Sequence, residues 1–338
     1  MFTAFNQQTL ETLLSPRSGE TKLGQTIMLL DTNRPLAQAL FYAKQQGARF
    51  AILGISEDLG PRANLGRGGA NDAFSAAMSQ WLNLQSNRFY TGTNCLILGE
   101  IAPPALAVDV SLEQLRQATQ ALDEQVIALV SQVFDAGLEP IVIGGGHNNA
   151  FGLLMAAKHS LGEPLAAVNL DPHSDFRPKE GRHSGNGFSY AAANGALDHY
   201  HVLGLHELKN TETTLEQLSL FGGTWHTYQQ IWVRRELSLS QALKQIAKEL
   251  NQTQLAVALE LDVDAINTMP SSASTVAGVP LMDALHYVNY IAKHCPTAYF
   301  HIAEAAPVCH SANLSAGYRD VGQSISELIY AYIQGRRT

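Results

Sequence analysis

The sequence predicts an α/β fold with a doubly wound, mainly parallel sheet. Short apolar runs recur along the chain, and segments of helical periodicity separate them. This alternation of strand and helix is typical of parallel sheets with helical connections. The runs are also apolar almost without interruption, as expected for strands that helices cover on both faces.

Six segments are predicted to form buried strands. Each is short and nearly wholly apolar, and amphipathic segments lie between them. In chain order the strands are residues 49–56, 140–145, 164–170, 199–205, 254–261 and 297–303.

Three amphipathic segments are predicted to form helices, over 111–137, 238–250 and 319–335. In the first, apolar residues recur along one stripe, and Gly137 follows as the expected C-cap. The stripe consists of Leu112, Leu115, Leu122, Val126, Leu129, Val130 and Val133.

The alternation indicates one domain over 46–338, and residues 1–45 are expected to form an N-terminal extension that packs on it. Three irregular stretches, 57–70, 172–196 and 265–282, each follow a predicted strand. They should therefore gather at the carboxyl edge of the sheet, where ligands bind in such folds.

The composition narrows the class of protein. Among 338 residues the net charge is −8, which argues against a nucleic-acid partner. No apolar stretch of about 18 residues predicts a membrane span, and no signal peptide is recognised at the N-terminus. The three cysteines form no CxxC pair, which is typical of reduced thiols. The expectation is a cytoplasmic protein that binds neither nucleic acid nor membrane.

Metal-ligand side chains follow three of the predicted strands. Residues i and i+2 of an extended chain point the same way, so each group can share a face. The residues are His147 after 140–145, Asp171, His173 and Asp175 after 164–170, and Asp262 and Asp264 after 254–261.

These six side chains predict a dinuclear metal centre. Their four carboxylates carry a formal charge of −4, which two divalent cations would balance, and without cations they would have to take up protons. Oxygen-rich ligation with imidazole and without cysteine favours Mn²⁺, followed by Mg²⁺, Co²⁺, Ni²⁺ and Zn²⁺. Two such ions would lower the pKa of a bridging water and provide hydroxide at neutral pH.

The three strand ends, Gly-Gly-x-His, Asp-x-His-x-Asp and Asp-x-Asp, resemble those of the ureohydrolase family, which includes arginase, agmatinase and formimidoylglutamase. The resemblance covers roughly 50–335. It implies a three-layer α/β/α domain around an eight-stranded parallel sheet, two Mn²⁺ per subunit, and assembly into homo-oligomers, as trimers or hexamers. It also implies that Asp171 and Asp262 bridge the ions, that His147 and Asp175 complete one site, and that His173 and Asp264 complete the other.

Glu304 matches the late-strand glutamate with which this family holds the amidine or guanidine group of its substrate. The expected mechanism is attack of a metal-bridging hydroxide on the amidine carbon, with Glu304 steadying the cationic nitrogen. Asp264 or His183 would then deliver a proton to the leaving amine.

Two departures from arginases and agmatinases bear on the substrate. Gly146 stands where those enzymes carry aspartate, and this third glycine resembles the formimidoylglutamase branch. Asn186 and Gly187 stand where arginases carry a proton-shuttling His-Gly segment, with His183 three residues earlier. Three alternative roles for His183 stay open: it shuttles a proton, it binds the substrate, or it is a solvated loop residue.

The predicted substrate is N-formimidoyl-L-glutamate, cleaved by water to L-glutamate and formamide in histidine breakdown. Arginine suits bidentate carboxylate contacts, and the substrate has two carboxylates. The predicted substrate-binding residues are Arg177, Arg182, Asn186 and Arg67.

Two alternatives stay open at this point. One is an agmatinase, an arginase or a guanidino-acid hydrolase, which would use the same metal chemistry. The other is a non-catalytic, metal-binding scaffold on the same fold. A dinuclear phosphatase or nuclease is disfavoured, because no lysine-rich loop or Ser/Thr nucleophile accompanies the ligands.

Overall fold

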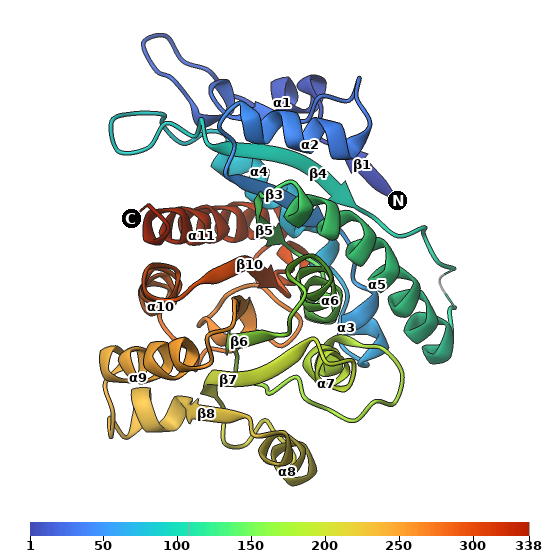
Figure 1. Cartoon of the computed structure of the whole chain (residues 1–338), viewed down its shortest axis with the longest axis vertical. Helices are drawn as coiled ribbons and strands as arrows, with labels where there is room; N and C mark the ends of the chain where they lie inside the picture. The colour runs from blue at the N-terminus through green and yellow to red at the C-terminus, as the bar shows by residue number, and fades with distance from the viewer. Residues whose placement is uncertain (108, 338) are drawn as a thin grey trace.

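The computed structural model describes residues 1–107 and 109–337. One twisted sheet runs through the molecule, with helices on both faces (Figure 1). Eight of its strands are β3 (Phe50–Ile55), β4 (Cys95–Ile101), β5 (Glu139–Ile143), β6 (Leu165–Leu170), β7 (Leu197–Leu205), β8 (Thr224–Thr227), β9 (Val257–Asp262) and β10 (Thr297–Ala303). These eight are parallel, in the order β4-β3-β5-β10-β9-β6-β7-β8, which confirms the predicted fold class.

Two short strands from the first 45 residues extend this sheet. β1 (Phe2–Ala4) pairs antiparallel with β4, and β2 (Met28–Leu29) pairs parallel with it. β1 approaches so closely that a Cβ on Gly99 would lie 2.0 Å from the Thr3 carbonyl oxygen, and Gly99 has a φ of 132°. Glycine is thus the residue that both the space and the backbone conformation favour.

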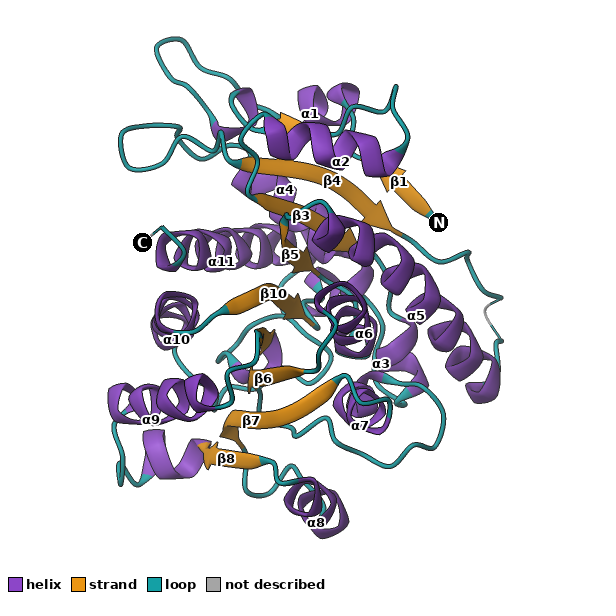
Figure 2. Ribbon diagram, in the orientation of Figure 1, coloured by secondary structure: helices purple, strands orange, loops and turns teal. Residues whose placement is uncertain are grey.

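The helices cover the two faces of the sheet (Figure 2). Two apolar cores lie between the sheet and these helices. One core includes residues of α1 (Gln7–Leu13), α4 (Ala73–Trp81), α9 (Leu239–Gln252), α10 (Leu281–His294) and α11 (Leu314–Gly335). The other includes residues of α2 (Leu36–Gln45), α3 (Leu59–Ala63), α5 (Leu112–Asp135), α6 (Asn149–Leu161), α7 (Gly187–Ala193) and α8 (Glu212–Phe221). Short 3₁₀ or π helices lie at Leu23–Gln25, Ala70–Asp72, Ser184–Asn186, Gln229–Val233, Val263–Ala265 and Pro307–Cys309. Within the described part of the chain, no helix has the length and apolarity to cross a membrane.

All six predicted strands are present, but the predictions omitted β4, β8 and the two short strands β1 and β2. Gly99 and Glu100 interrupt the apolar run of β4, whereas β8 is a four-residue edge strand with no fully buried side chain. Edge strands bury less apolar surface, so they carry a weaker sequence pattern.

The three predicted helices are also present. α5 begins after a capping box of Ser111 and Gln114, and Gly137 follows its end with a φ of 73°, as predicted. The predicted apolar stripe is buried except for Leu112, which is exposed in the first turn. α11 begins five residues earlier than predicted, after the N-cap Asn313.

The strand order brings the ligand-type residues together. The chain builds the sheet outward through β3 and β4, returns to β5, and later inserts β10 and β9 between β5 and β6. The four central neighbours β5, β10, β9 and β6 therefore end side by side at one edge. Those are the strands that the predicted ligands and Glu304 follow or terminate.

Candidate metal centre

A cavity of ≈ 600 Å³ opens at the carboxyl edge of the sheet. All three irregular stretches predicted to gather there contribute to its wall, through Asn64, Ser184 and Ser272 among others. Lys209 and Thr211 add a fourth segment, after β7, that the sequence did not indicate. Five acidic or imidazole side chains form the floor: His173, Asp175, Asp262, Asp264 and Glu304.

The loop that carries His147 is held by a carboxylate that sequence reasoning missed. Glu57, which is 1% exposed, accepts hydrogen bonds at Oε1 from the Gly146 N–H and the Asn149 side-chain amide, both at 2.7 Å. A Cβ on Gly146 would lie 2.3 Å from Pro61 Cδ, so the third glycine allows close packing here. The only available signal was an acidic residue directly after a predicted strand.

The first group of ligand atoms surrounds Nδ1 of His147. This nitrogen lies 3.3 Å from Asp171 Oδ2, 3.1 Å from Asp175 Oδ2 and 3.4 Å from Asp262 Oδ2. None of these contacts has hydrogen-bond geometry, and Nδ1 is a buried atom without a hydrogen-bond partner. Three carboxylate oxygens around an unpaired imidazole nitrogen fit a divalent cation.

A second group of ligand atoms shares Asp262 with the first and adds His173 and Asp264. Backbone N–H groups orient its carboxylates, since Asp264 N–H donates to Asp262 Oδ1 at 2.7 Å. Asp264 Oδ1 is buried without a partner. All six predicted ligands thus converge in two groups that share Asp262.

Backbone strain accompanies the site at two residues. Asp175 has a φ of 46° and Glu304 a φ of 68°, both in the left-handed region that residues other than glycine seldom adopt. Such conformations are retained where surrounding contacts impose them, often at functional sites.

The titration behaviour of the cluster also fits cations. Burial, Asp264 and Asp171 raise the pKa of Asp262 well above its ordinary value, and burial and Asp171 raise the pKa of Asp175. Burial opposes protonation of His173, but Asp171 raises its pKa to about 9. Protons thus take the place of positive charge that divalent ions would supply, and binding of ions would displace them.

Glu304 lies beside this cluster and lines the cavity. Its Oε1 accepts a hydrogen bond from the His147 backbone N–H at 2.8 Å, which fixes the side chain next to the ligand loop. Burial, Asp262 and Asp264 raise its pKa well above the ordinary value. An acidic group in this place favours a cationic partner in the cavity.

Three residues predicted to bind substrate or carry protons lie behind the cavity wall. Arg182 is 3% exposed, and its Nε donates to Asp123 Oδ2 at 2.7 Å. The Arg182 guanidinium also donates to Asn186 Oδ1, and its plane lies over the rings of Phe151 and Tyr190. Neither Arg182 nor Asn186 lines the cavity, because both are used to fold the loop 177–187.

His183 is likewise buried and does not line the cavity. Its Nδ1 accepts from the Gly185 N–H at 3.1 Å, so Nε2 carries the proton and donates to Glu180 Oε1 at 3.2 Å. Glu180 does line the cavity, and His183 supports it from behind. The solvated-loop role does not agree with this burial.

The remaining two predicted arginines differ in position. Arg177 lines the cavity and is half-exposed, and its guanidinium donates to Asn64 Oδ1 at 2.6 Å and to Glu180 Oε1 at 2.8 Å. Arg67 instead donates to the carbonyl oxygens of Ser271 and Ser272, so it joins the first and third cavity loops.

The environment of His183 predicts a specific pH dependence of stability. Burial and Arg177 lower its pKa to about 4, whereas an unfolded histidine titrates near about 6.5. The stabilisation from this group is complete above pH 6.5 and is lost as the pH falls toward 4. When the pH falls from 7 to 5, the free energy of unfolding of the chelator-treated protein should drop by up to about 2 kcal/mol relative to that of a His183→Gln variant. Urea unfolding measures both.

An exposed histidine provides the matched control for this measurement. His286 lies on the surface of α10, so His286→Gln should track the parent protein at both pH values. Other titrating groups, the metal ligands included, are common to all three proteins and cancel in the difference. The prediction would be contradicted if the free energies of unfolding of the parent and of His183→Gln differed by the same amount at pH 7 and pH 5.

Comparison with known proteins gives consistent matches. The model of the arginase family matches residues 48–318. A formimidoylglutamase of Streptococcus pyogenes is 28% identical over 289 residues, which cover 81% of this chain and 83% of the relative.

Solved structures share the fold. Formimidoylglutamase from Bacillus subtilis superposes with a TM-score of 0.75 at 17% identity, over 95% of this chain and 94% of that one. Trypanosoma cruzi formiminoglutamase, solved with two Mn²⁺, superposes with a TM-score of 0.70 at 18% identity, over 94% and 98% of the two chains.

Proposed function

Because the chain belongs to the arginase family, whose members are metal-dependent hydrolases of amidines, we propose that it hydrolyses N-formimidoyl-L-glutamate to L-glutamate and formamide. The observation that supports this best is a buried ligand cluster and a glutamate at the floor of a cavity whose wall carries two cations. The similarity to the formimidoylglutamase of S. pyogenes supports the same substrate.

The six ligands would hold two Mn²⁺ ions in this proposal. His147 and Asp175 would serve one ion and His173 and Asp264 the other, and Asp262, which belongs to both groups, would serve both. Asp171 belongs to the first group, and because its Oδ1 lies 3.4 Å from His173 Nδ1 it would also serve the second ion. When bound, the ions supply a nucleophilic water at neutral pH and offset the negative charge that develops during attack. The Mn²⁺ in the related T. cruzi structure favours manganese over other divalent metals.

The protein's own groups orient the substrate and move the proton. Glu304 would accept hydrogen bonds from the cationic formimidoyl nitrogen and so fix the carbon above the ligand cluster. Asp264 Oδ1 is buried without a hydrogen-bond partner, so this carboxylate can accept a proton from the attacking water and pass it to the leaving amine. We assign this step to Asp264, because His183 does not line the cavity.

The cavity wall favours a substrate with carboxylates. Arg177 lies on one loop and Lys209 on another, and both line the cavity. In the described part of the chain, the Lys209 ammonium makes no salt bridge, so it can pair with a ligand anion. Glutamate presents two carboxylates, whereas agmatine presents none and would place its amine against these cations.

Replacing Lys209 should weaken substrate binding selectively. We expect Lys209→Gln to raise KM for formimidoylglutamate about 10-fold or more, because a charged hydrogen bond contributes roughly 1.5–3 kcal/mol. Turnover at saturation should change little, since Lys209 does not contact the ligand cluster. Lys248→Gln, on the exposed side of α9, is the matched control and should leave KM unchanged. An unchanged KM in Lys209→Gln would remove Lys209 from the substrate site.

A substrate comparison tests the function itself. Initial rates of the Mn²⁺-loaded protein would be measured with N-formimidoyl-L-glutamate, agmatine, arginine and 4-guanidinobutyrate, each with a chelator control. Formimidoylglutamate should exceed the others by orders of magnitude, and the chelator should abolish the rate. A faster guanidine compound would retain the metal chemistry but reject the assigned substrate. If none of the four compounds is hydrolysed at full metal occupancy, a non-catalytic scaffold would be favoured.

A further inference from the structure

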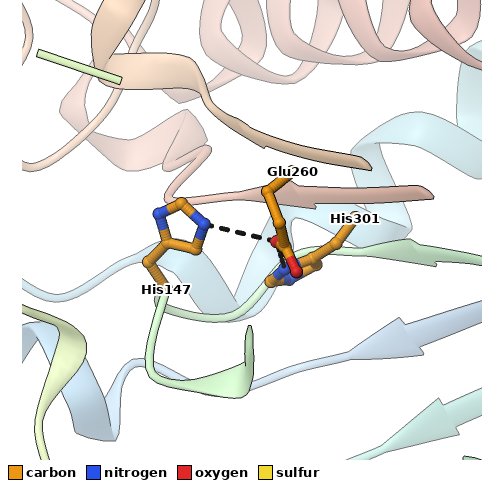
Figure 3. Close-up of side chains that lie close together, drawn as sticks. All are labelled: His147, Glu260 and His301. Carbon is orange, nitrogen blue, oxygen red and sulfur yellow. Dashed lines mark hydrogen bonds and ion pairs between the residues drawn. The ribbon is translucent and has the colours of Figure 1, made fainter. Parts of the chain in front are cut away.

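A buried carboxylate that the proposed mechanism does not use lies beneath the ligand cluster. Glu260 is fully buried on β9, two residues before Asp262, so both side chains leave the same face of the strand. Its neighbour in the sheet register is His301 on β10. Figure 3 shows the Glu260 carboxylate between the imidazoles of His147 and His301.

Three donors satisfy this carboxylate. Tyr299 Oη donates to Glu260 Oε1 at 2.6 Å, and His301 Nδ1 donates to Oε2 at 2.7 Å. His147 Nε2 lies 3.3 Å from the same Oε2. A carboxylate held by hydrogen-bond donors on both oxygens can stay ionised in the core.

An ionised carboxylate accepts hydrogen bonds and cannot donate them, which determines the tautomer of His147. In the neutral imidazole, which is the form that binds a metal ion, a proton on Nε2 that faces Glu260 leaves Nδ1 with its lone pair. Nδ1 is the nitrogen that has no hydrogen-bond partner and faces the oxygens of Asp171, Asp175 and Asp262. The arrangement thus presents a lone pair where a cation would bind.

We infer that Glu260 is a positioning residue that holds His147 as the Nε2–H tautomer and thereby prepares Nδ1 to bind a metal ion. Tyr299 and His301, on β10, fix the Glu260 carboxylate on β9. Glu260 in turn contacts His147 in the loop after β5, so hydrogen bonds connect the core with the metal centre. The inference rests on the proposed metal centre. It adds a determinant of metal affinity that lies outside the six ligands.

His147, Glu260 and His301 also form a group with ligand atoms close enough for a metal ion. The short contacts of Glu260 favour hydrogen bonding instead, because 2.6 and 2.7 Å are ordinary hydrogen-bond lengths for these donors. A metal ion there would also have to displace the donors that satisfy the carboxylate.

The first test replaces Glu260 by the isosteric glutamine. Glu260→Gln removes the charge and places an amide beside two imidazoles, so the Nε2–H tautomer of His147 loses its preference. We expect the affinity for Mn²⁺, measured by competition with a chelator, to fall about 10- to 100-fold. Tyr299→Phe keeps the charge of Glu260 and its contact with His147. The affinity for Mn²⁺ should therefore fall several-fold less than in Glu260→Gln.

The parent protein provides a second readout that does not depend on a buried variant folding. In ¹⁵N-histidine-labelled, Zn²⁺-loaded protein, NMR should show one ligand imidazole protonated at Nε2 and bound through Nδ1, and this signal should change in Glu260→Gln. Metal binding through Nε2 of His147, or unchanged affinity in a folded Glu260→Gln, would overturn the inference, as would three ions per chain. If the parent protein binds no divalent ion at all, the proposed metal centre fails first.

Discussion

Asp262→Asn should reduce bound Mn²⁺ from the proposed two ions per chain to one or none and lower kcat/KM by about 10³-fold or more. Asp262 belongs to both groups of ligand atoms, so its loss affects both ions. Asparagine can keep the hydrogen bond from Asp264 N–H at Oδ1, but its amide would point a donor toward the unpaired Nδ1 of His147. Charge stabilisation by metal ions contributes several kilocalories per mole, which corresponds to this loss of rate.

The metal-free variant gives an independent check on that explanation. Burial, Asp264 and Asp171 raise the pKa of Asp262, so at a pH above the ordinary carboxyl value this group disfavours the folded protein when no cation is present. Chelator-treated Asp262→Asn should therefore resist urea better than the chelator-treated parent at pH 7. The order should reverse when Mn²⁺ is added, because the ions bind and stabilise only the parent.

Metal content after gel filtration, urea unfolding and initial rates together test this prediction. Asp198→Asn, at an exposed position near the start of β7, is the matched control and should match the parent in all three. A variant at Asp262 that keeps two ions and full turnover would show that the ligand assignment is wrong. Loss of activity together with loss of stability in the metal-free state would indicate misfolding instead.

The ligand cluster is the part of the molecule that the sequence predicted best. Five of its six members are spaced by two at or just after the ends of two buried strands, and His147 follows a third strand alone. Regular strand geometry does not extend to all of them, since Asp264 lies in the short helix Val263–Ala265 and Asp175 has a φ of 46°. The edge at which they meet follows from the parallel sheet alone. The order of the strands did not follow from these patterns, because β9 and β10 insert between β5 and β6 from far along the chain.

Residues that support the site were hidden for a different reason. Glu57 and Glu260 act through contacts with residues about 90 and 40 positions away, such as Gly146 and His301. A single acidic residue has no period or motif that distinguishes a buried carboxylate from a solvated one. Their role becomes visible only when burial and donors are known.

The sequence also could not show that Arg182 lies outside the cavity. An arginine in a cavity loop fits both a carboxylate of the substrate and a carboxylate of the protein, and sequence spacing does not separate the two. In the structure this guanidinium forms a salt bridge with Asp123, on α5. Lys209 was omitted for the converse reason, since it lies in a loop that carries no ligand.

Glu304→Gln should lower kcat/KM by about 10²- to 10³-fold while both Mn²⁺ ions stay bound. Glu304 belongs to neither group of ligand atoms, so its replacement removes no ligand of either ion. Glutamine can still accept the hydrogen bond from His147 N–H, which keeps the ligand loop in place. What it loses is the charged contact with the substrate cation, and removing one preorganised electrostatic contact typically has an effect of this size.

The combination of retained metal and lost turnover makes this prediction specific. Metal titration and initial rates would be measured on the same preparation, with Glu216→Gln, on the exposed surface of α8, as the matched control. Loss of metal in Glu304→Gln would assign Glu304 to the support of His147 instead of the substrate. Full turnover would mean that the cationic nitrogen is held elsewhere. Because Asp262→Asn loses both properties and Glu304→Gln only one, the pair separates binding of the metals from orientation of the substrate.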